Sequence, residues 1–140
     1  VGVETICFGR RASGETFDRG SLRLATDIRC EGKPLWRERG VIEGGSALLA
    51  SPIALAGFSV CSTLLAAGAE LTPEALAACR TAGSREAGAQ WGVSLLPQLL
   101  VGRYLGHSAE AAREWLMQLW AVLRPAMSGR EAIAPRIWNT

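Results

Sequence analysis

The alternation of apolar and polar positions divides the first third of the chain into strands. Residues 3–8 contain Val, Thr, Ile and Phe, which favour strands. From Ser21 to Cys30 apolar and polar residues alternate, which is the period of a strand with one buried face. Residues 31–34 are typical of a hairpin connection, and residues 35–43 form the expected return strand. The charged middle of that strand predicts a sheet edge or a partner surface.

Residues 44–69 carry no charge. The run is long enough to cross a bilayer, but proline, glycine and several hydroxyl residues interrupt it. We interpret residues 46–57 as a loop or a short turn of helix. Residues 58–67 then form a strand covered on both faces, because such a strand has a continuous apolar sequence. The alternative is a small membrane protein with spans near 47–69 and 87–106.

The second half of the chain predicts a helix followed by two strands. Thr72 supplies a side-chain cap, and Pro73 suits the first helical position. We expect this helix over residues 74–82. Residues 89–96 and 99–105 are expected to form two strands that a proline separates.

The clearest helix signal follows at Ser108, whose hydroxyl can cap the first turn. Glu110 lies where the positive end of the helix dipole favours an anion. The apolar face recurs at helical spacing through Ala111, Ala112, Trp115, Leu116, Leu119, Trp120 and Leu123. We expect Pro125 to end the helix, because proline lacks the N–H that the next hydrogen bond needs, and Gly129 to mark the break. The element order predicts a mainly β single domain, residues 1–140, with two α-helices.

Composition and charge narrow the class of protein. The chain has 140 residues, of which 49% are hydrophobic, so it can form a modest core. A net charge of +2 is too small to indicate a nucleic-acid partner. The four cysteines lack zinc-ligand spacing, and we interpret them as reduced, mostly buried thiols of a cytoplasmic protein. Disulfides are the alternative. The cysteines are Cys7, Cys30, Cys61 and Cys79.

Reactive groups do not converge in the sequence, so we expect no catalytic activity. The sequence has no Gly-x-Ser-x-Gly segment, and its single lysine, Lys33, follows no glycine-rich loop. The single histidine, His107, has no neighbouring cysteine or acid with which to hold a metal. We therefore expect only weak binding of transition metals.

Two short segments leave alternatives open. Glu15 either forms an ion pair with a neighbouring arginine or offers an oxygen ligand on the route of a divalent cation, with Asp18 or Asp27 as companions. At the other end, Arg136 and Trp138 are residue types that dominate interface hot spots. The tail either anchors a partner or folds back on its own sheet.

These segments resemble one known family. The matching residues at the end of the chain are Tyr104-Leu105-Gly106, Leu123-Arg124-Pro125, Gly129-Arg130, Pro135-Arg136-Ile137-Trp138 and Thr140. They resemble the C-terminus of the urease accessory protein UreD, also called UreH. Gly9-Arg10-Arg11-Ala12-Ser13-Gly14-Glu15 resembles that family's Gly-Arg-x-Ala-x-Gly-Glu segment. The motif residues that we assign from this resemblance are Gly9, Arg10, Gly14, Glu15, Arg103, Tyr104, Arg124, Pro125 and Pro135.

The resemblance implies a fold and a function. The fold is a β-rich, solenoid-like layer with two helices, of which this chain would be the C-terminal portion. The function is a non-enzymatic scaffold in urease maturation, which binds the urease apoprotein and UreF-like and UreG-like accessory proteins. Nickel is the transported ion rather than a bound cofactor, and Glu15 and Asp18 are candidate transient contacts. Arg136, Ile137 and Trp138 are the candidate partner-binding residues, with no nucleic-acid or membrane partner.

The start of the chain suggests a longer β layer. Residue 1 is not Met, and the chain begins next to the expected strand over residues 3–8. A layer cut part-way leaves a bare apolar face and unpaired backbone groups. We therefore expect the isolated chain to self-associate, and we expect Val3, Ile6, Leu22, Leu24 or Ile28 to be more exposed than their residue types prefer.

Overall fold

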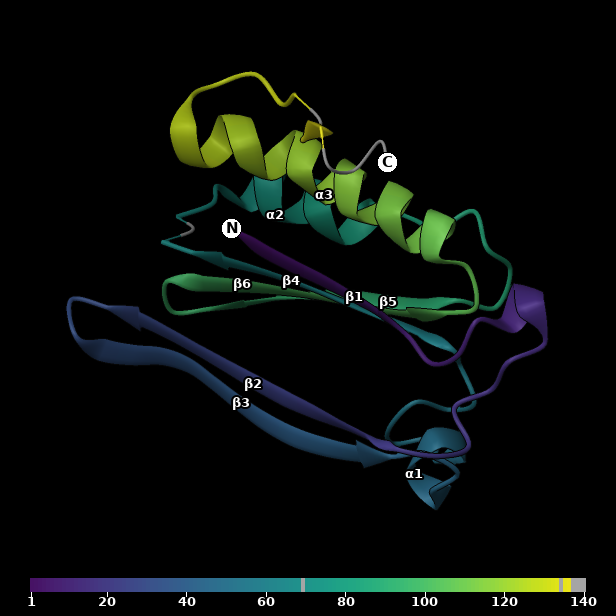
Figure 1. The fold of residues 1–140 in the computed structure, drawn as a ribbon. Helices are drawn as coiled ribbons and strands as arrows, with labels where there is room; N and C mark the ends of the chain where they lie inside the picture. The colour runs from purple at the N-terminus through teal and green to yellow at the C-terminus, as the bar shows by residue number, and fades with distance from the viewer. Residues whose placement is uncertain (69, 134, 137–140) are drawn as a thin grey trace.

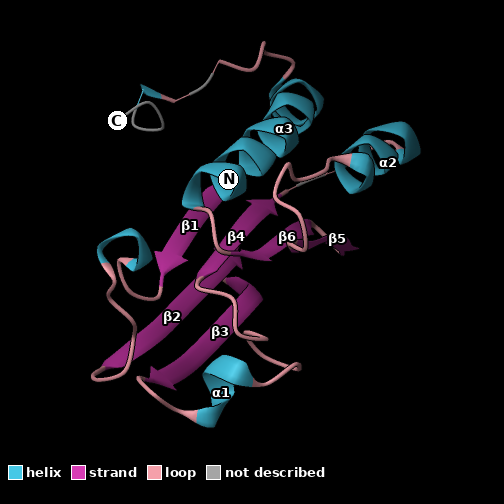
Figure 2. Ribbon diagram, turned by 90° about the vertical axis from the view of Figure 1, so that its right-hand side faces the viewer, coloured by secondary structure: helices cyan, strands magenta, loops and turns pink. Residues whose placement is uncertain are grey.

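The structure is a computed structural model that describes residues 1–68, 70–133 and 135–136. Its elements form three layers (Figure 1). Helices α2 (Pro73–Thr81) and α3 (Ala109–Ser128) cover one face of a four-stranded sheet. A two-stranded hairpin lies on the other side of that sheet, as the rotated view also shows (Figure 2). The predicted class, mainly β with two helices, is confirmed.

The four-stranded sheet is antiparallel throughout. Its strands are β1 (Gly2–Cys7), β4 (Val60–Ala67), β6 (Leu99–Gly106) and β5 (Gln90–Leu96), in the order β1-β4-β6-β5. The charge-free run therefore supplies the inner strand β4, as the sequence predicted, because this strand is covered by helices on one face and by the hairpin on the other.

The hairpin is formed by β2 (Ser21–Cys30) and β3 (Lys33–Glu43). Strand β3 begins two residues earlier than predicted, because Lys33 still pairs with Cys30. The register shifts between Ile28 and Arg29, which marks a bulge or irregularity in the pairing. Both strands are edges of a two-stranded sheet, as the charged middle of β3 indicated. The solenoid-like arrangement implied by the resemblance stays a prediction.

Side chains on the two faces of β4 and β6 alternate between two cores. The larger core joins the sheet to the helices and includes Leu64, Ala66, Leu100, Tyr104, Ala112, Trp115, Leu116, Leu119 and Leu123. The smaller core joins the sheet to the hairpin and consists of Leu65, Leu99 and Val101, against which Ile28, Trp36 and Ala67 pack. The helices are thus held by a broad apolar interface, and the hairpin by a narrow one.

Gly102 sets the distance between β6 and α3. A Cβ atom at this position would lie 3.0 Å from Cδ1 of Leu119 and 3.2 Å from a ring carbon of Trp115. Both neighbours are fully buried, so neither can move far without opening the core. The absence of a side chain at Gly102 therefore allows the helix to pack directly against the strand.

The prediction that Pro125 ends the last helix is wrong. Helix α3 continues through Pro125 to Ser128, and it ends at Gly129, which has φ +62° and donates its N–H to the Pro125 carbonyl at 2.8 Å. Proline removes one hydrogen bond to the carbonyl four residues earlier. That residue, Ala121, is exposed, so water can satisfy its carbonyl. The helix therefore continues for a further turn before the left-handed glycine ends it.

The ranges considered as membrane spans have another structure. Residues 47–69 include the single turn α1 (Ala47–Ala50) and β4, and residues 87–106 include the β5–β6 hairpin. Among the described residues, no helix is both long enough and apolar enough to cross a membrane. The prediction of a loop or short helical turn over residues 46–57 is confirmed.

The five apolar residues expected to be exposed lie outside the buried core. Val3 is 37% exposed. The other four, which are Ile6, Leu22, Leu24 and Ile28, are half-buried, because the sheet and the hairpin cover each other in part. The self-association expected of the isolated chain stays a prediction.

Replacing Gly102 by Val tests the close approach of α3. We expect a loss of about 1–3 kcal/mol of unfolding free energy, because the new side chain would overpack against Trp115 and Leu119. Gly92 in the adjacent strand β5 is the matched control, since nothing lies within 4 Å of a Cβ there. Urea denaturation of both variants gives the difference. Equal stabilities for Gly102→Val and Gly92→Val would contradict this account.

Candidate functional site

A cleft of about 270 Å³ opens between the four-stranded sheet and the hairpin. We call it the inter-sheet cleft. Two packed sheets ordinarily meet through apolar side chains, but this cleft contains two carboxylates and two threonine hydroxyls. Its lining residues are Gly2, Val3, Glu4, Thr26, Ile28, Glu38, Thr63 and Leu65.

The period of the strands turns these polar groups inward. On β3, Glu38 has the same phase as Trp36, which packs against the smaller core. Thr26 pairs with Glu38 across the hairpin, and Glu4 pairs with Thr63 across β1 and β4. Neither Glu4 nor Glu38 was predicted from the sequence to belong to a site. Glu38 could have been recognised from the sequence, because it is a charged residue at a position of an alternating strand that is expected to face the core.

Arg103 of β6 bridges the sheet and the hairpin. Its Nη2 donates to Oε1 of Glu38 at 2.7 Å, and its Nη1 donates to the Thr63 hydroxyl at 3.4 Å. The guanidinium also lies 5.9 Å from the ring centre of Trp36. The two charged side chains are 43% and 28% exposed, so water screens their attraction. The contact therefore fixes the position of Glu38 more than it stabilises the fold.

Two further groups show the polar character of this layer. The indole N–H of Trp36 is buried and has no hydrogen-bond partner among the described residues. A buried donor of this kind is costly unless water or another polar group reaches it. On β4, burial raises the pKa of the Cys61 thiol, and the charges of Glu38 and Glu4 raise it further, against the opposing effect of Arg103. The thiol therefore remains protonated at neutral pH and is a poor metal ligand.

Among the described residues, the inter-sheet cleft lacks the ligand set of a tight metal site. Within residues 1–68, 70–133 and 135–136, no group of three or more His, Cys, Asp or Glu side chains could hold a metal ion. Glu4 and Glu38 offer carboxylate oxygens, but Arg103 already occupies one oxygen of Glu38. A borderline metal such as nickel prefers imidazole or thiolate ligands, which the cleft does not supply in usable form.

Glu15 forms an ion pair within its own loop. Nε and Nη2 of Arg10 donate to its two oxygens at 2.8 and 2.5 Å, and this hydrogen bonding lowers the pKa of Glu15. The chain passes so close to Gly9 that a Cβ there would lie 2.6 Å from the Glu15 carbonyl oxygen. Asp18 accepts a hydrogen bond from the Thr16 hydroxyl. Neither acid lines the inter-sheet cleft, so their role as nickel contacts stays a prediction.

The C-terminal segment folds back along α3 as far as the structure describes it (Figure 1). The indole N–H of Trp120 donates to the Ile133 carbonyl at 3.0 Å, and Arg124 lies 5.4 Å from the ring centre of the same tryptophan. Pro135 is half-buried and Arg136 is exposed. Ile137 and Trp138 lie outside the described residues, so the proposed anchor at 136–138 stays a prediction.

A carboxylate that the sequence analysis did not single out organises the start of α3. Glu86 accepts hydrogen bonds from the Tyr104 hydroxyl at 2.6 Å and from the backbone N–H groups of His107 and Ser108 at 2.6 and 3.1 Å. A Cβ at Gly106 would lie 2.5 Å from the same carboxylate. The segment Tyr104-Leu105-Gly106 therefore has a structural explanation. Its tyrosine donates a hydrogen bond to Glu86, and its glycine leaves space for the Glu86 carboxylate.

The cysteines differ from the prediction of mostly buried thiols. All four are free thiols, but Cys7 and Cys30 are exposed, and Cys61 is half-buried. Cys7 ends the edge strand β1, and Cys30 ends β2 at the tip of the hairpin, so neither reaches a core. Cys79 of α2 is the buried one.

The fold and the cleft thus define a β-rich protein in which an ion pair connects two layers beside a cleft with polar lining residues. Comparison with known proteins identifies its family. A family model described as UreD urease accessory protein matches residues 1–139. The urease accessory protein UreD of Janthinobacterium sp. (strain Marseille) is 46% identical over 141 residues, which cover 100% of this chain and 48% of the relative. UreD of Azoarcus sp. (strain BH72) is 48% identical over 140 residues, with the same coverage.

The chain belongs to the UreD family of urease accessory proteins. It spans about half the length of the curated relatives that it matches. The family resemblance expected from the sequence is confirmed.

The Glu86 contacts predict a dependence of stability on pH. Partial burial opposes ionisation, but the hydrogen bonds from Tyr104, His107 and Ser108 outweigh it and lower the pKa of Glu86. A lowered pKa contributes stability above the unfolded-state value, about 4.3, and this contribution is lost as the pH falls through the folded-state value. We expect Glu86→Gln to cost about 1–2 kcal/mol at pH 7 and much less at pH 3.

Denaturant unfolding at the two pH values measures this difference. Glu110→Gln is the matched control, because Glu110 is an exposed acid in the first turn of the same helix. The control should change the unfolding free energy by less than about 0.5 kcal/mol. A Glu86→Gln penalty that stays the same at both pH values would show that ionisation of this carboxyl contributes nothing.

Proposed function

We propose that this chain serves urease maturation as a scaffold without enzymatic turnover. In this role it brings the urease apoprotein together with UreF-like and UreG-like accessory proteins, and nickel passes along the inter-sheet cleft. Membership of the UreD family supports the role in maturation. The observation that supports this route is the polar lining of the cleft. It includes Glu4, which is exposed, and Glu38, which Arg103 holds in place, whereas two packed sheets ordinarily meet through apolar side chains.

The chemistry of the inter-sheet cleft suits transfer of an ion. A carrier that must release nickel gains from carboxylate contacts, because oxygen ligands bind this metal more weakly than imidazole and thiolate do. The two carboxylates come from different layers, since Glu4 lies on β1 and Glu38 lies on β3. A cation can therefore meet successive oxygens without being enclosed by a complete ligand set.

Removing the two carboxylates tests the passage. We expect E4Q/E38Q to lower the nickel content of urease severalfold after co-expression with the apoprotein and accessory proteins, because a passing cation loses both oxygens and faces Arg103 alone. Metal analysis of purified urease measures the effect. Glu43→Gln is the matched control, since Glu43 lies on the same strand but is exposed and is not among the residues lining the cleft.

Two measurements keep this test specific. Thermal unfolding of E4Q/E38Q must show that the hairpin is still folded. Calorimetry of the wild-type chain with nickel should find no site tighter than about micromolar, which corresponds to about 8 kcal/mol. Full nickel loading of urease with a folded E4Q/E38Q variant would rule out the cleft as the route.

The tail provides a separate test of partner binding. We expect R136A/W138A to weaken binding of a UreF-like protein, because arginine and tryptophan contribute strongly where an interface excludes water. A pull-down with purified partner measures binding, and far-UV circular dichroism checks the fold. Arg130→Ala, an exposed cation that precedes the tail, is the control. Unchanged binding by R136A/W138A would mean that the tail is not the anchor.

A further inference from the structure

The outer face of the hairpin carries a concentration of arginine. Strand alternation turns Arg23 and Arg29 of β2 outward, and the register places Arg37 and Arg39 of β3 on the same face. We call this surface the arginine face, and we include in it the two outward carboxylates. Its charged residues are Arg23, Asp27, Arg29, Arg37, Arg39 and Glu43.

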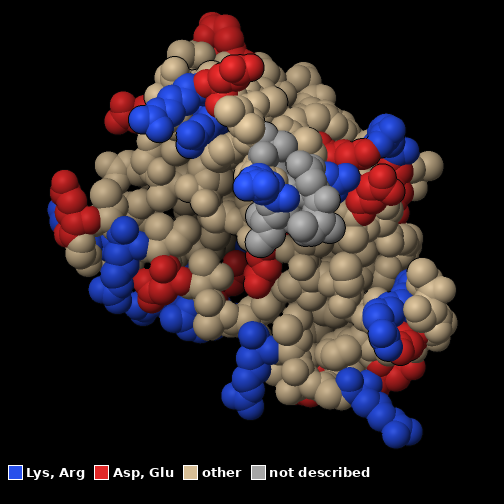
Figure 3. Space-filling view, turned by 45° about the horizontal axis from the view of Figure 1, so that its top comes forward, with Lys and Arg blue, Asp and Glu red and all other residues tan. Residues whose placement is uncertain are grey.

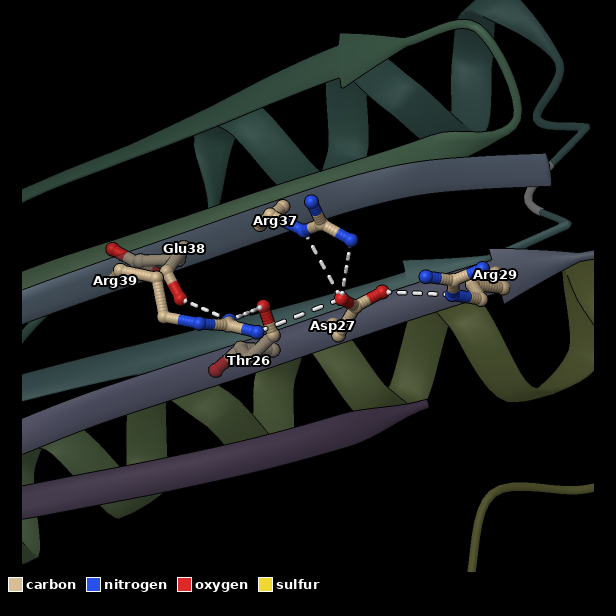
Figure 4. A network of polar contacts seen from close by, with 6 residues as sticks. All are labelled: Thr26, Asp27, Arg29, Arg37, Glu38 and Arg39. Atoms are coloured by element: carbon tan, nitrogen blue, oxygen red, sulfur yellow. Dashed lines mark hydrogen bonds and ion pairs between the residues drawn. The ribbon is translucent and has the colours of Figure 1, made fainter.

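Three of the arginines surround one carboxylate (Figure 4). Asp27 accepts from Arg29 Nε at 3.3 Å, and its second oxygen lies 3.0 Å from Nη2 of Arg37 and 3.5 Å from Nη2 of Arg39. Desolvation would raise the pKa of Asp27, but the hydrogen bond from Arg37 and the neighbouring positive charges lower it. Asp27 is thus ionised, and its single negative charge is shared among three guanidinium groups. Each guanidinium has five N–H donors, so the carboxylate does not use all of them.

The arginine face accounts for the net charge of the whole chain. It holds four cations and two anions, while the chain has fifteen cations and thirteen anions. Eleven charges of each sign therefore remain elsewhere and cancel. Viewed from the helical side, positive and negative residues are indeed interspersed (Figure 3). Outside the arginine face, the formal charges of the chain sum to zero.

The guanidinium groups are held in place and still accessible. Nη1 of Arg39 donates to the carbonyl oxygens of Thr26 at 2.9 Å and of Glu38 at 2.7 Å (Figure 4). The side chains of Arg29, Arg37 and Arg39 are between 53% and 56% exposed. A side chain that is already ordered loses less entropy when it binds. The face is therefore prepared for an anionic partner.

The arginine face also has an apolar part. Val41 lies opposite Arg23 in the hairpin register and is 51% exposed. An open groove of about 490 Å³ runs beside it, lined by Arg23, Leu24, Ala25, Arg39, Gly40 and Val41. Arginine beside exposed apolar surface is typical of protein–protein interfaces.

We propose that the arginine face is a docking surface for an acidic segment of a partner protein. Side chains two residues apart on a strand are about 6.7 Å apart, so Arg37 and Arg39 match carboxylates at alternate positions of an extended partner segment. Val41 and the groove receive an apolar side chain of that segment. This proposal rests on the scaffold role above, because a scaffold needs a surface for each partner.

A protein carboxylate fits this face better than a phosphate polymer or a lipid surface. The arginines already hold a carboxylate, Asp27, in their own cluster. Asp27 and Glu43 would repel a continuous polyanion, and the total charge of +2 gives no long-range field to hold one. A short acidic segment can place its charges between these two anions.

The first experiment measures binding of a labelled peptide with Glu and Thr in alternation, by fluorescence anisotropy at low salt. A peptide with Gln in place of Glu is the ligand control. We expect R23E/R37E to weaken binding by about tenfold, since two attractions become repulsions. R80E/R130E makes the same charge change at exposed residues on α2 and after α3, and should change binding by less than about twofold.

A second variant has the opposite expected effect. Asp27→Asn keeps the shape of the side chain but removes the anion that competes for the arginines. We expect it to tighten binding of the acidic peptide by about threefold, because the local excess of charge rises. Damage to the hairpin could only weaken binding, so this variant separates recognition from stability. If R23E/R37E fails to fold, R23Q/R37Q removes the two charges without reversing them. Thermal unfolding shows whether each variant is folded.

The same variants are then tested with the purified urease apoprotein and a purified UreF-like protein. The proposal is supported if R23E/R37E binds one of these two partners more weakly than the wild-type chain does. Replacing acidic residues of that partner by lysine should then restore binding to R23E/R37E. Wild-type chain that binds neither partner refutes the scaffold role. If the wild-type chain binds a partner and every variant binds that partner equally well, the arginine face is refuted and the scaffold role is unaffected. Tighter binding to single-stranded RNA or to phosphatidylserine vesicles than to the acidic peptide also overturns this assignment.

Discussion

The close packing of α3 on β6 across Gly102 is the contact on which the other features depend. Trp115 and Leu119 lie within 3.0–3.2 Å of the position that a Cβ would occupy there. This close packing holds β6 against α3. The next residue, Arg103, then points to the opposite face of the sheet, because side chains alternate along a strand. Its guanidinium reaches Glu38 at 2.7 Å and so sets where the hairpin carboxylate stands in the inter-sheet cleft. A glycine in the larger core thus determines the geometry of a charged group in the other layer.

The two sides of the sheet are held with unequal strength. The helical side buries a broad set of large apolar residues, among them Trp115, Tyr104 and several leucines. The hairpin side has a smaller cluster around Leu99 and Val101, with a screened ion pair beside it. Regions with few buried apolar contacts open at lower free energy than the main core. The hairpin is therefore the layer that can separate from the sheet while the helices stay in place, and this would suit the proposed passage of an ion along the cleft.

The elements could be predicted from the sequence because each has a local signal. Alternation marked β2, a charge-free run marked β4, and the Thr72–Pro73 pair marked the start of α2. The end of α3 was missed because the effect of Pro125 depends on whether water reaches the carbonyl of Ala121, which is a property of the packed molecule.

The candidate site depended on tertiary contacts and so had no comparable local signal. Glu86 meets Tyr104, His107 and Ser108, which are 18 to 22 residues away in the chain. Glu38 meets Arg103 over a separation of 65 residues. Alternation could show that Glu38 shares a face with Trp36, but not that this face is covered by a second sheet. The sequence therefore indicated a charged strand without indicating which of its charges lay inside.

Strand β3 combines two kinds of chemistry because its side chains alternate. Glu38 points into the inter-sheet cleft, while Arg37 and Arg39 point outward from the hairpin. A register slip of one residue would exchange the two sets, placing arginines in the cleft and a carboxylate outside. Trp36 opposes such a slip, since it belongs to the inward phase and packs against the smaller core. The apolar contact that attaches the hairpin therefore also keeps the carboxylate toward the proposed nickel route and the arginines toward the proposed acidic partner. A substitution of Trp36 would disturb both surfaces together, whereas substitutions at Glu38 or Arg37 separate them.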